Sequence, residues 1–161
     1  MPEPSRVQCQ VYVERSADEV FAYFADPAHW GRMTPDPDPD TVVSGGCGVL
    51  EVGSVVTLST ARSGRLESMT LLVEESDGTM FVERQLSGPF AHWVLRRRVA
   101  PFQSGALVNE QVEFRPGGAL VLLPERLVKS GPIERWLGYR QQSAKRILEQ
   151  LMRVRGVSTI R

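Results

Sequence analysis

The stretch GPIERWLGYRQQSAKRILEQLMRV, from Gly131 to Val154, predicts one long helix at the C-terminal end of the chain. Its apolar residues recur at spacings of three and four, so they form a single stripe along the helix. The stripe consists of Ile133, Leu137, Ala144, Ile147, Leu148 and Leu151. Arg140 stands in the middle of this stripe, where a further apolar residue is due. A charged residue on the inner face of a closing helix suggests a gap beneath the helix that is put to use.

Most of the chain before this helix has the alternation that is typical of half-buried strands. The first strand is expected at Val7–Val13. The later strand-like runs are Thr41–Ser44, Ser54–Ala61, Leu66–Glu74, Thr79–Leu86, Ala91–Phe102 and Ala106–Arg115. Glycine-containing connections as short as Asp77-Gly78 and Ser104-Gly105 separate them, and such turns predict an antiparallel meander.

Two short helices are expected after the first strand. Ser16-Ala-Asp-Glu19 reads as a capping box, in which the Ser16 hydroxyl accepts from the backbone of Glu19 and the Glu19 carboxylate reaches back. Asp26-Pro27 begins the second helix, because aspartate caps well and proline needs no donor at the first helical position. The following run, Pro35 to Asp40, alternates proline with aspartate and predicts an extended acidic loop. A short helix is a further expectation within Leu120–Lys129.

This order of elements, with the stretch SADEVFAYFADPAHW from Ser16 to Trp30, resembles the START-like, or SRPBCC, superfamily. Gly88-Pro89-Phe90 before an aromatic strand and the pair Tyr139-Arg140 in the final helix are similar to bacterial members known as polyketide cyclase/dehydrase-like or ligand-binding proteins. The resemblance implies an α+β helix-grip fold in one domain, residues 1–161. In that fold a curved antiparallel sheet of about seven strands wraps round the long C-terminal helix, with two short helices after the first strand.

The resemblance is specific for the fold and not for an activity, because the superfamily includes lipid carriers, hormone receptors and cyclases. Its members often alternate histidines in the strand after the tryptophan. This chain has Leu95 and Arg97 at those places, so no role of such histidines is carried over.

Three charged residues are candidates for a polar site. Arg97 shares a strand face with Trp93, and Glu110 shares one with Phe114, so both charges point inward if the aromatic residues do. A buried guanidinium needs a partner, and a carboxylate offers the best geometry. We hypothesise that Arg97, Glu110 and Arg140 form the polar end of an apolar cavity and bind a ligand carboxylate or hydroxyl. In the opposite register, Arg97 and Glu110 face solvent instead.

Large apolar side chains are expected to line this cavity, although the same side chains would also serve as ordinary core. The candidates are Trp30, Met33, Met69, Phe81, Trp93, Trp136 and Tyr139.

Motifs for metals, nucleophiles and phosphates are missing from the sequence. Asp36, Asp38 and Asp40 match the start of a calcium loop, but Thr41 and Cys47 stand where that loop needs glycine and glutamate. Neither histidine has a second metal ligand at a suitable spacing. No Gly-x-Ser-x-Gly elbow occurs, and the glycine cluster near residue 46 lacks the lysine of a phosphate loop. We therefore expect no metal and no cofactor.

The distribution of charge is uneven although the formal net charge is zero. Residues 1–124 carry 10 basic and 16 acidic side chains (net −6), and residues 125–161 carry 9 and 3 (net +6). The zero total argues against nucleic acid as a partner. No apolar run approaches the roughly 18 residues of a membrane helix, and no signal peptide is evident. Two cysteines without an export signal favour free thiols, so we expect a cytoplasmic protein, with a homodimer left open.

The sequence thus favours a binding protein for a small hydrophobic or amphipathic molecule: a lipid, isoprenoid, quinone or polyketide. One alternative is a cyclase or dehydratase in the same cavity, with Glu110 as general acid/base, its pKa raised by burial, and Arg97 or Arg140 steadying an enolate. Another is an interaction protein that uses the basic face of the last helix. We expect binding rather than catalysis.

Overall fold

The computed structural model describes residues 3–33, 42–62, 65–117 and 130–157. Its helices are α1 (Ala17–Phe24), the 3-10 helix η1 (Pro27–Met33) and α2 (Ser130–Val157). Its strands are β1 (Ser5–Val13), β2 (Val42–Ser44), β3 (Val55–Arg62), β4 (Arg65–Ser76), β5 (Met80–Ser87), β6 (Phe90–Phe102) and β7 (Gly105–Pro116). The predicted Pro-Asp loop at 35–40 and the whole of the predicted segment Leu120–Lys129 lie outside the described residues, as does the calcium-like triplet.

The strands form one antiparallel sheet in the order β1-β7-β6-β5-β4-β3-β2. From β2 to β7 each strand pairs with the next in the chain, and β1 closes the far edge by pairing with β7. This confirms the predicted antiparallel sheet and its meander. The turn at Asp77-Gly78 forms as expected: Gly78 has a φ of +89°, and Asp77 Oδ1 accepts from the backbone N–H groups of Thr79 and Met80 at 2.8 and 2.6 Å.

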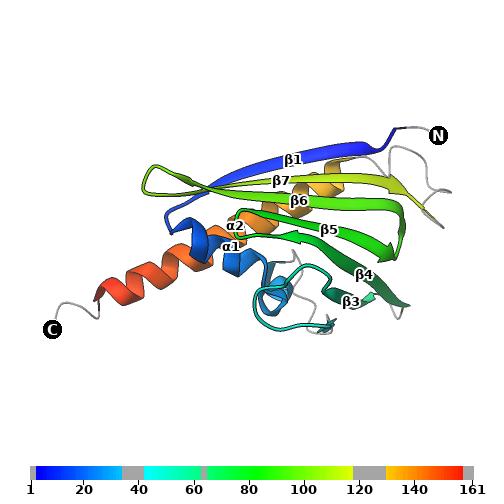
Figure 1. Ribbon diagram of the computed structural model, residues 1–161, viewed down its shortest axis with the longest axis horizontal. Helices are drawn as coiled ribbons and strands as arrows, with labels where there is room; N and C mark the ends of the chain where they lie inside the picture. Colours follow the sequence, from blue (N-terminus) through cyan, green and yellow to red (C-terminus); the bar gives the residue numbers. More distant parts are fainter. Residues whose placement is uncertain (1–2, 34–41, 63–64, 118–129, 158–161) are drawn as a thin grey trace.

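The sheet curves, and the long helix lies against it. Register shifts interrupt β4 between Val73 and Glu75 and β6 between Phe90 and His92. Such bulges bend a strand and increase its twist. Figure 1 shows α2 crossing one face of the curved sheet, with α1 beside it and the red C-terminal end of α2 projecting past the strands. This is the predicted helix-grip arrangement.

The apolar stripe of α2 is buried along most of its length. Leu137, Ala144 and Leu148 are buried, whereas Leu151 is 50% exposed. Leu151 belongs to the predicted stripe and yet is exposed, since it lies toward the C-terminal end of α2, which projects past the strands (Figure 1). None of the helices in the described ranges combines the length and the apolarity that a membrane crossing demands.

The short helices begin where the sequence predicts. Ser16 Oγ accepts from the backbone N–H of Glu19 at 3.3 Å, which is half of the expected capping box. The Glu19 carboxylate does not complete the box and pairs instead with the Arg15 guanidinium. Asp26 Oδ1 accepts from the N–H of Ala28 at 2.9 Å, so it starts η1 in the expected way.

The inner face of the sheet carries the predicted register. Phe81, Arg97, Glu110 and Cys9 lie directly opposite one another across β5, β6, β7 and β1. Phe81, Arg97 and Glu110 are at most 1% exposed, and Trp93, which shares a face of β6 with Arg97, is also buried. The alternative register, with Arg97 and Glu110 in solvent, is therefore excluded. The row places two charged groups in the core beneath α2.

Candidate functional site

A buried ion pair joins β6 and β7. Nε and Nη2 of Arg97 donate to Oε2 of Glu110 at 3.0 and 2.8 Å, and the two side chains are 1% and 0% exposed. The two residues are direct partners in the β6–β7 ladder, so the strand pairing itself places their side chains next to each other. Two donors on one edge of a guanidinium give this contact both strength and a fixed direction.

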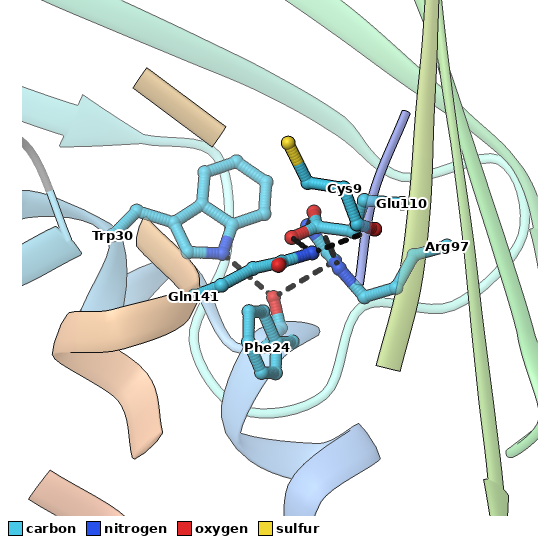
Figure 2. Close-up of polar contacts among 6 residues, drawn as sticks. All are labelled: Cys9, Phe24, Trp30, Arg97, Glu110 and Gln141. Carbon is cyan, nitrogen blue, oxygen red and sulfur yellow. Dashed lines mark hydrogen bonds and ion pairs between the residues drawn. The ribbon is translucent and has the colours of Figure 1, made fainter. Parts of the chain in front are cut away.

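The third donor of Arg97 reaches the end of α1. Its Nη1 donates to the carbonyl oxygen of Phe24 at 3.3 Å, and Nε1 of Trp30 donates to the same oxygen at 2.9 Å. Figure 2 shows both bonds meeting at this carbonyl. The last carbonyls of a helix lack partners within the helix and carry partial negative charge, so a cation and an indole N–H suit them. The Arg97 guanidinium also lies 4.8 Å from the centre of the Phe24 ring.

Gln141 connects this pair to α2. Its Nε2 donates to Oε1 of Glu110 at 3.2 Å and to the carbonyl oxygen of Cys9 at 3.1 Å (Figure 2). Sequence reasoning missed Gln141, which is 2% exposed. The signal was present, because Gln141 stands four residues after Leu137 and three before Ala144, on the apolar stripe itself.

The environment of Glu110 corrects one expectation from the sequence. Burial by itself raises the pKa of this carboxyl, but the charges of Arg97 and Arg140 and the hydrogen bonds from Arg97 and Gln141 together bring it below its ordinary value. The expected rise was wrong because it considered burial without the partners. Glu110 is held as a carboxylate with both oxygens occupied, which does not suit a general acid.

Arg140 is placed differently from Arg97. It is 5% exposed, and its Nε and Nη2 have no hydrogen-bond partner in the part of the chain that the structure describes. Its guanidinium carbon lies 4.6 Å from the centre of the Trp136 ring, and that ring packs edge-on against Trp93 at 5.8 Å. Burial lowers the pKa of Arg140, partly offset by the negative charge of Glu110. An N–H edge without a partner in the core is uncommon and needs an explanation.

Glu83 on β5 is a second buried group that sequence reasoning missed. It is 3% exposed, and no described residue hydrogen-bonds to its Oε2. Burial raises the pKa of Glu83 more than the positive charges of Arg97 and Arg140 lower it. Its position two residues after the buried Phe81 was the available signal, since alternate residues share a strand face. Within the described residues, no ion pair joins Glu83 to Arg140.

The apolar candidates are distributed over three environments. Trp30, Met33, Phe81 and Trp93 are buried. Met69 and Trp136 are partly buried and pack against the core. Tyr139 is 37% exposed and stands apart from the buried cluster, although it precedes Arg140 in the helix.

The outer face of α2 is the surface that an interaction protein would use, the alternative function considered from the sequence. Lys145 Nζ donates to the carbonyl oxygen of Tyr12 and to Glu149 Oε1, both at 2.7 Å, so this cation is already engaged within the chain. A polar groove of about 220 Å³ lies on the same face, lined by Gln142, Lys145, Arg146, Glu149 and Gln150. Across the described ranges, no three His, Cys, Asp or Glu side chains gather in a way that could hold a metal ion.

Comparison with solved structures identifies the architecture. The Zhui aromatase/cyclase from Streptomyces sp. R1128 matches with a TM-score of 0.69 at 20% identity, over 95% of this chain and 98% of that chain. A START superfamily protein from Mycobacterium smegmatis matches with a TM-score of 0.66 at 14% identity, over 91% and 98%. This chain has the START-like helix-grip fold.

A third match is the di-domain ARO/CYC StfQ from the steffimycin biosynthetic pathway, with a TM-score of 0.73 at 12% identity over 93% of this chain. This chain spans about half of StfQ, 52% of its length. No family model and no curated protein sequence matches the chain. At these identities the likeness establishes the START-like fold and leaves the ligand to be argued from the residues.

Proposed function

We propose that this protein binds a small hydrophobic or amphipathic molecule between the sheet and α2. The observation that carries the proposal is a set of buried polar atoms without partners: Nε and Nη2 of Arg140, Oε2 of Glu83 and Nε1 of Trp93. Solidly packed cores satisfy nearly all such atoms, since each unsatisfied one costs about 1–3 kcal/mol. A bound molecule with its own polar atoms would supply the missing partners.

The surroundings of these atoms fit an apolar body with a polar end. The Trp93 and Trp136 rings meet at the interface between β6 and α2, and Phe81 lies in the next strand. Burying an apolar ligand against such surfaces is worth about 25 cal/mol per Å² before the cost of association. Arg140 and Glu83 would then fix its orientation. Trp30, Met33 and Met69 are proposed to complete the apolar lining.

The roles that we propose for the charged residues differ from those in the sequence hypothesis. Arg97 has every nitrogen of its guanidinium engaged, and Glu110 has both oxygens engaged. We assign this pair to holding α1, the sheet and α2 together. Direct contact with the ligand is assigned to Arg140 and Glu83.

The test has two parts. Native mass spectrometry of the purified protein should show an adduct that disappears on denaturation, and Nile red, a neutral apolar dye, should fluoresce more strongly in the presence of the protein. W93R places a charged side chain in the apolar lining and should abolish dye binding, whereas H92R on the opposite strand face should leave it intact. A protein that carries no adduct and does not enhance Nile red fluorescence would refute the proposal.

A second candidate function, a cyclase or dehydratase, is favoured by Glu83 rather than by Glu110. A buried carboxyl with a raised pKa keeps its proton to a higher pH than an exposed one and can deliver it, which Glu110 is not placed to do. The similarity in fold to Zhui and StfQ, an aromatase/cyclase and an ARO/CYC, supports considering it. Turnover of a β-hydroxy-ketone that E83Q abolishes would support catalysis, and absence of turnover in the parent protein would leave binding as the function.

We propose the cytoplasm as the compartment and a small molecule rather than nucleic acid as the partner. Cys9 and Cys47 are both free in the structure, as a reducing compartment would keep them. The whole of residues 1–161 is proposed to act as one domain, because the described helices all lie against a single sheet.

A further inference from the structure

Arg97 and Arg140, two of the buried arginines, both turn an Nε and Nη2 edge into the interior, and the edge of Arg97 is filled. Arg97 donates through Nε and Nη2 to one oxygen of Glu110, Oε2, at 3.0 and 2.8 Å. Arg140 has the same two atoms buried and, among the described residues, without a hydrogen-bond partner. This edge of a guanidinium has two parallel N–H bonds whose spacing matches the two oxygens of a carboxylate. Arg140 thus offers an open edge of the kind that Arg97 has already filled with a carboxylate.

The balance of charge in the cluster also favours the binding of an anion. The groups that act on one another here are Arg97 on β6, Glu110 on β7, Glu83 on β5 and Arg140 on α2. Arg97 and Glu110 neutralise each other through their contact. Burial favours the neutral form of Glu83, and Glu83 makes no ion pair with Arg140 among the described residues. The Arg140 guanidinium is therefore a buried cation whose counter-charge is not supplied in full.

We propose that the ligand carries a carboxylate and that the Nε and Nη2 edge of Arg140 binds its two oxygens, with the apolar body of the ligand against Trp136 and Trp93. This rests on the proposed binding function and narrows its ligand class to amphipathic organic acids. The Trp136 ring lies against one side of the guanidinium, 4.6 Å from its carbon to the ring centre, and so favours binding of the anion from another side.

The test compares acids with their esters, which share the same body and lack the anion. Decanoic acid is paired with methyl decanoate, and 2-naphthoic acid with methyl 2-naphthoate, each measured by displacement of Nile red near neutral pH. A hydrogen-bonded charge contact predicts that the acid of at least one pair binds about tenfold to a hundredfold more tightly than its ester. Equal affinity of acid and ester would overturn the carboxylate inference while leaving the binding function intact. Failure of all four compounds to displace bound dye would also overturn it, and failure of the dye itself to bind would refute the binding function.

Variants assign the preference to Arg140. R140M keeps an unbranched apolar side chain and should abolish the preference for the acid without weakening ester binding. R140K keeps the charge but loses the two-donor edge, so it should retain only part of the preference. R146M, the same change at an exposed position of α2, should behave as the parent protein. A full preference for the acid in R140M would overturn the assignment.

Stability gives an independent readout. An unpaired buried guanidinium is costly, so R140M without ligand should melt at a higher temperature than the parent protein. A lower melting temperature would mean that the edge is already paired within the protein, and would overturn the proposal. If R140M fails to fold, the acid and ester affinities of the parent protein and of R140K still decide the question.

Discussion

At the scale of single residues, two buried carboxyl groups in one cluster behave oppositely. Glu110 has its pKa lowered because the charges of Arg97 and Arg140, helped by the hydrogen bonds from Arg97 and Gln141, outweigh the effect of burial. Glu83 has its pKa raised because burial outweighs the attraction of Arg97 and Arg140. Both carboxyl groups are fully buried, so the direct contact with Arg97, rather than depth, decides which carboxyl stays charged.

The first prediction concerns the pH dependence of stability in E83Q. The folded-state pKa of Glu83 lies above its ordinary value of 4.5, so its contribution to stability is present below that value and is lost as the pH rises through the folded-state pKa. Glutamine does not titrate. Urea unfolding should therefore show E83Q gaining stability relative to the parent protein between about pH 4 and about pH 7. A constant difference across that range would contradict the raised pKa.

E110Q is the matched variant and should show the opposite sign. The folded-state pKa of Glu110 lies below 4.5, so its contribution is present above that value and is lost as the pH falls through the folded-state pKa. At neutral pH, removing the carboxylate leaves Arg97 buried without its partner, at a cost of about 3–5 kcal/mol. The cost should shrink as the pH falls below about 4.5 in the same urea experiments. A cost that grows toward acid pH would contradict this assignment.

Which site residues the sequence could predict follows from the same chemistry. The burial of Arg97 and Glu110 followed from alternation with Trp93 and Phe114, because a strand face is a local property. Glu83 obeyed the same rule beside Phe81 and was missed because an acidic residue is usually exposed. The direction of the pKa shift at Glu110 was predicted wrongly, since burial raises this pKa and the charges of Arg97 and of Arg140, which comes from a distant helix, outweigh burial.

At the scale of elements, α2 contains a glycine that its packing does not require. A Cβ added at Gly138 would meet nothing within 4 Å, apart from the backbone of the helix itself. Glycine in a helix interior is less favourable than alanine by roughly 0.5–1 kcal/mol. G138A should therefore raise the free energy of unfolding by about that amount, measured by urea denaturation.

G105A is the contrasting variant, at the start of β7. Its Cβ would lie 2.2 Å from the carbonyl oxygen of Val13, a backbone atom that cannot turn aside. Overpacking of this kind typically costs about 1–3 kcal/mol, and here the β1–β7 pairing would have to shift. If G105A is as stable as the parent protein, or G138A is less stable, the packing described for these two elements is wrong.

The bounds of an element were predictable where a local sequence pattern fixes them. The burial of a helix was not predictable where the helix extends past the sheet that it packs against. The strand ends fell within two residues of the alternating runs, because glycine-containing turns such as Asp77-Gly78 fix them chemically. Leu151 belongs to the stripe of α2 by spacing and is nevertheless exposed. Spacing gives the direction of a side chain, whereas burial also requires that the partner sheet extend that far.

At the scale of the whole molecule, one hydrogen-bonded chain of contacts joins segments that are far apart in sequence. From α2 it runs through Gln141 to Glu110 on β7, then to Arg97 on β6, and ends at the Phe24 carbonyl of α1 (Figure 2). Gln141 also reaches the β1 backbone at Cys9. A ligand between the sheet and α2 therefore needs an entrance away from this chain of contacts.

The segment from Gly45 to Gly53 is the structural candidate for that entrance. Leu50 is its buried anchor, through its side chain and through an N–H bond to the Ala25 carbonyl at 3.0 Å, while its neighbours are exposed. Segments with few buried contacts open at low free energy, whereas β6 and β7 each pair on both sides. Release of the Leu50 side chain and of its N–H bond would therefore let the segment move.

Hydrogen exchange on the intact protein tests this last prediction. Amides in 45–53 should exchange well before those of β6 and β7. L50A should speed exchange in 45–53 with little change in β6 and β7. Decanoate at saturating concentration should slow exchange in α2 and in 45–53, because a filled interior holds its covering elements closed. Protection confined to β6 and β7, or L50A exchange that rises equally everywhere, would mean that the molecule opens as one unit and that this segment is no separate door.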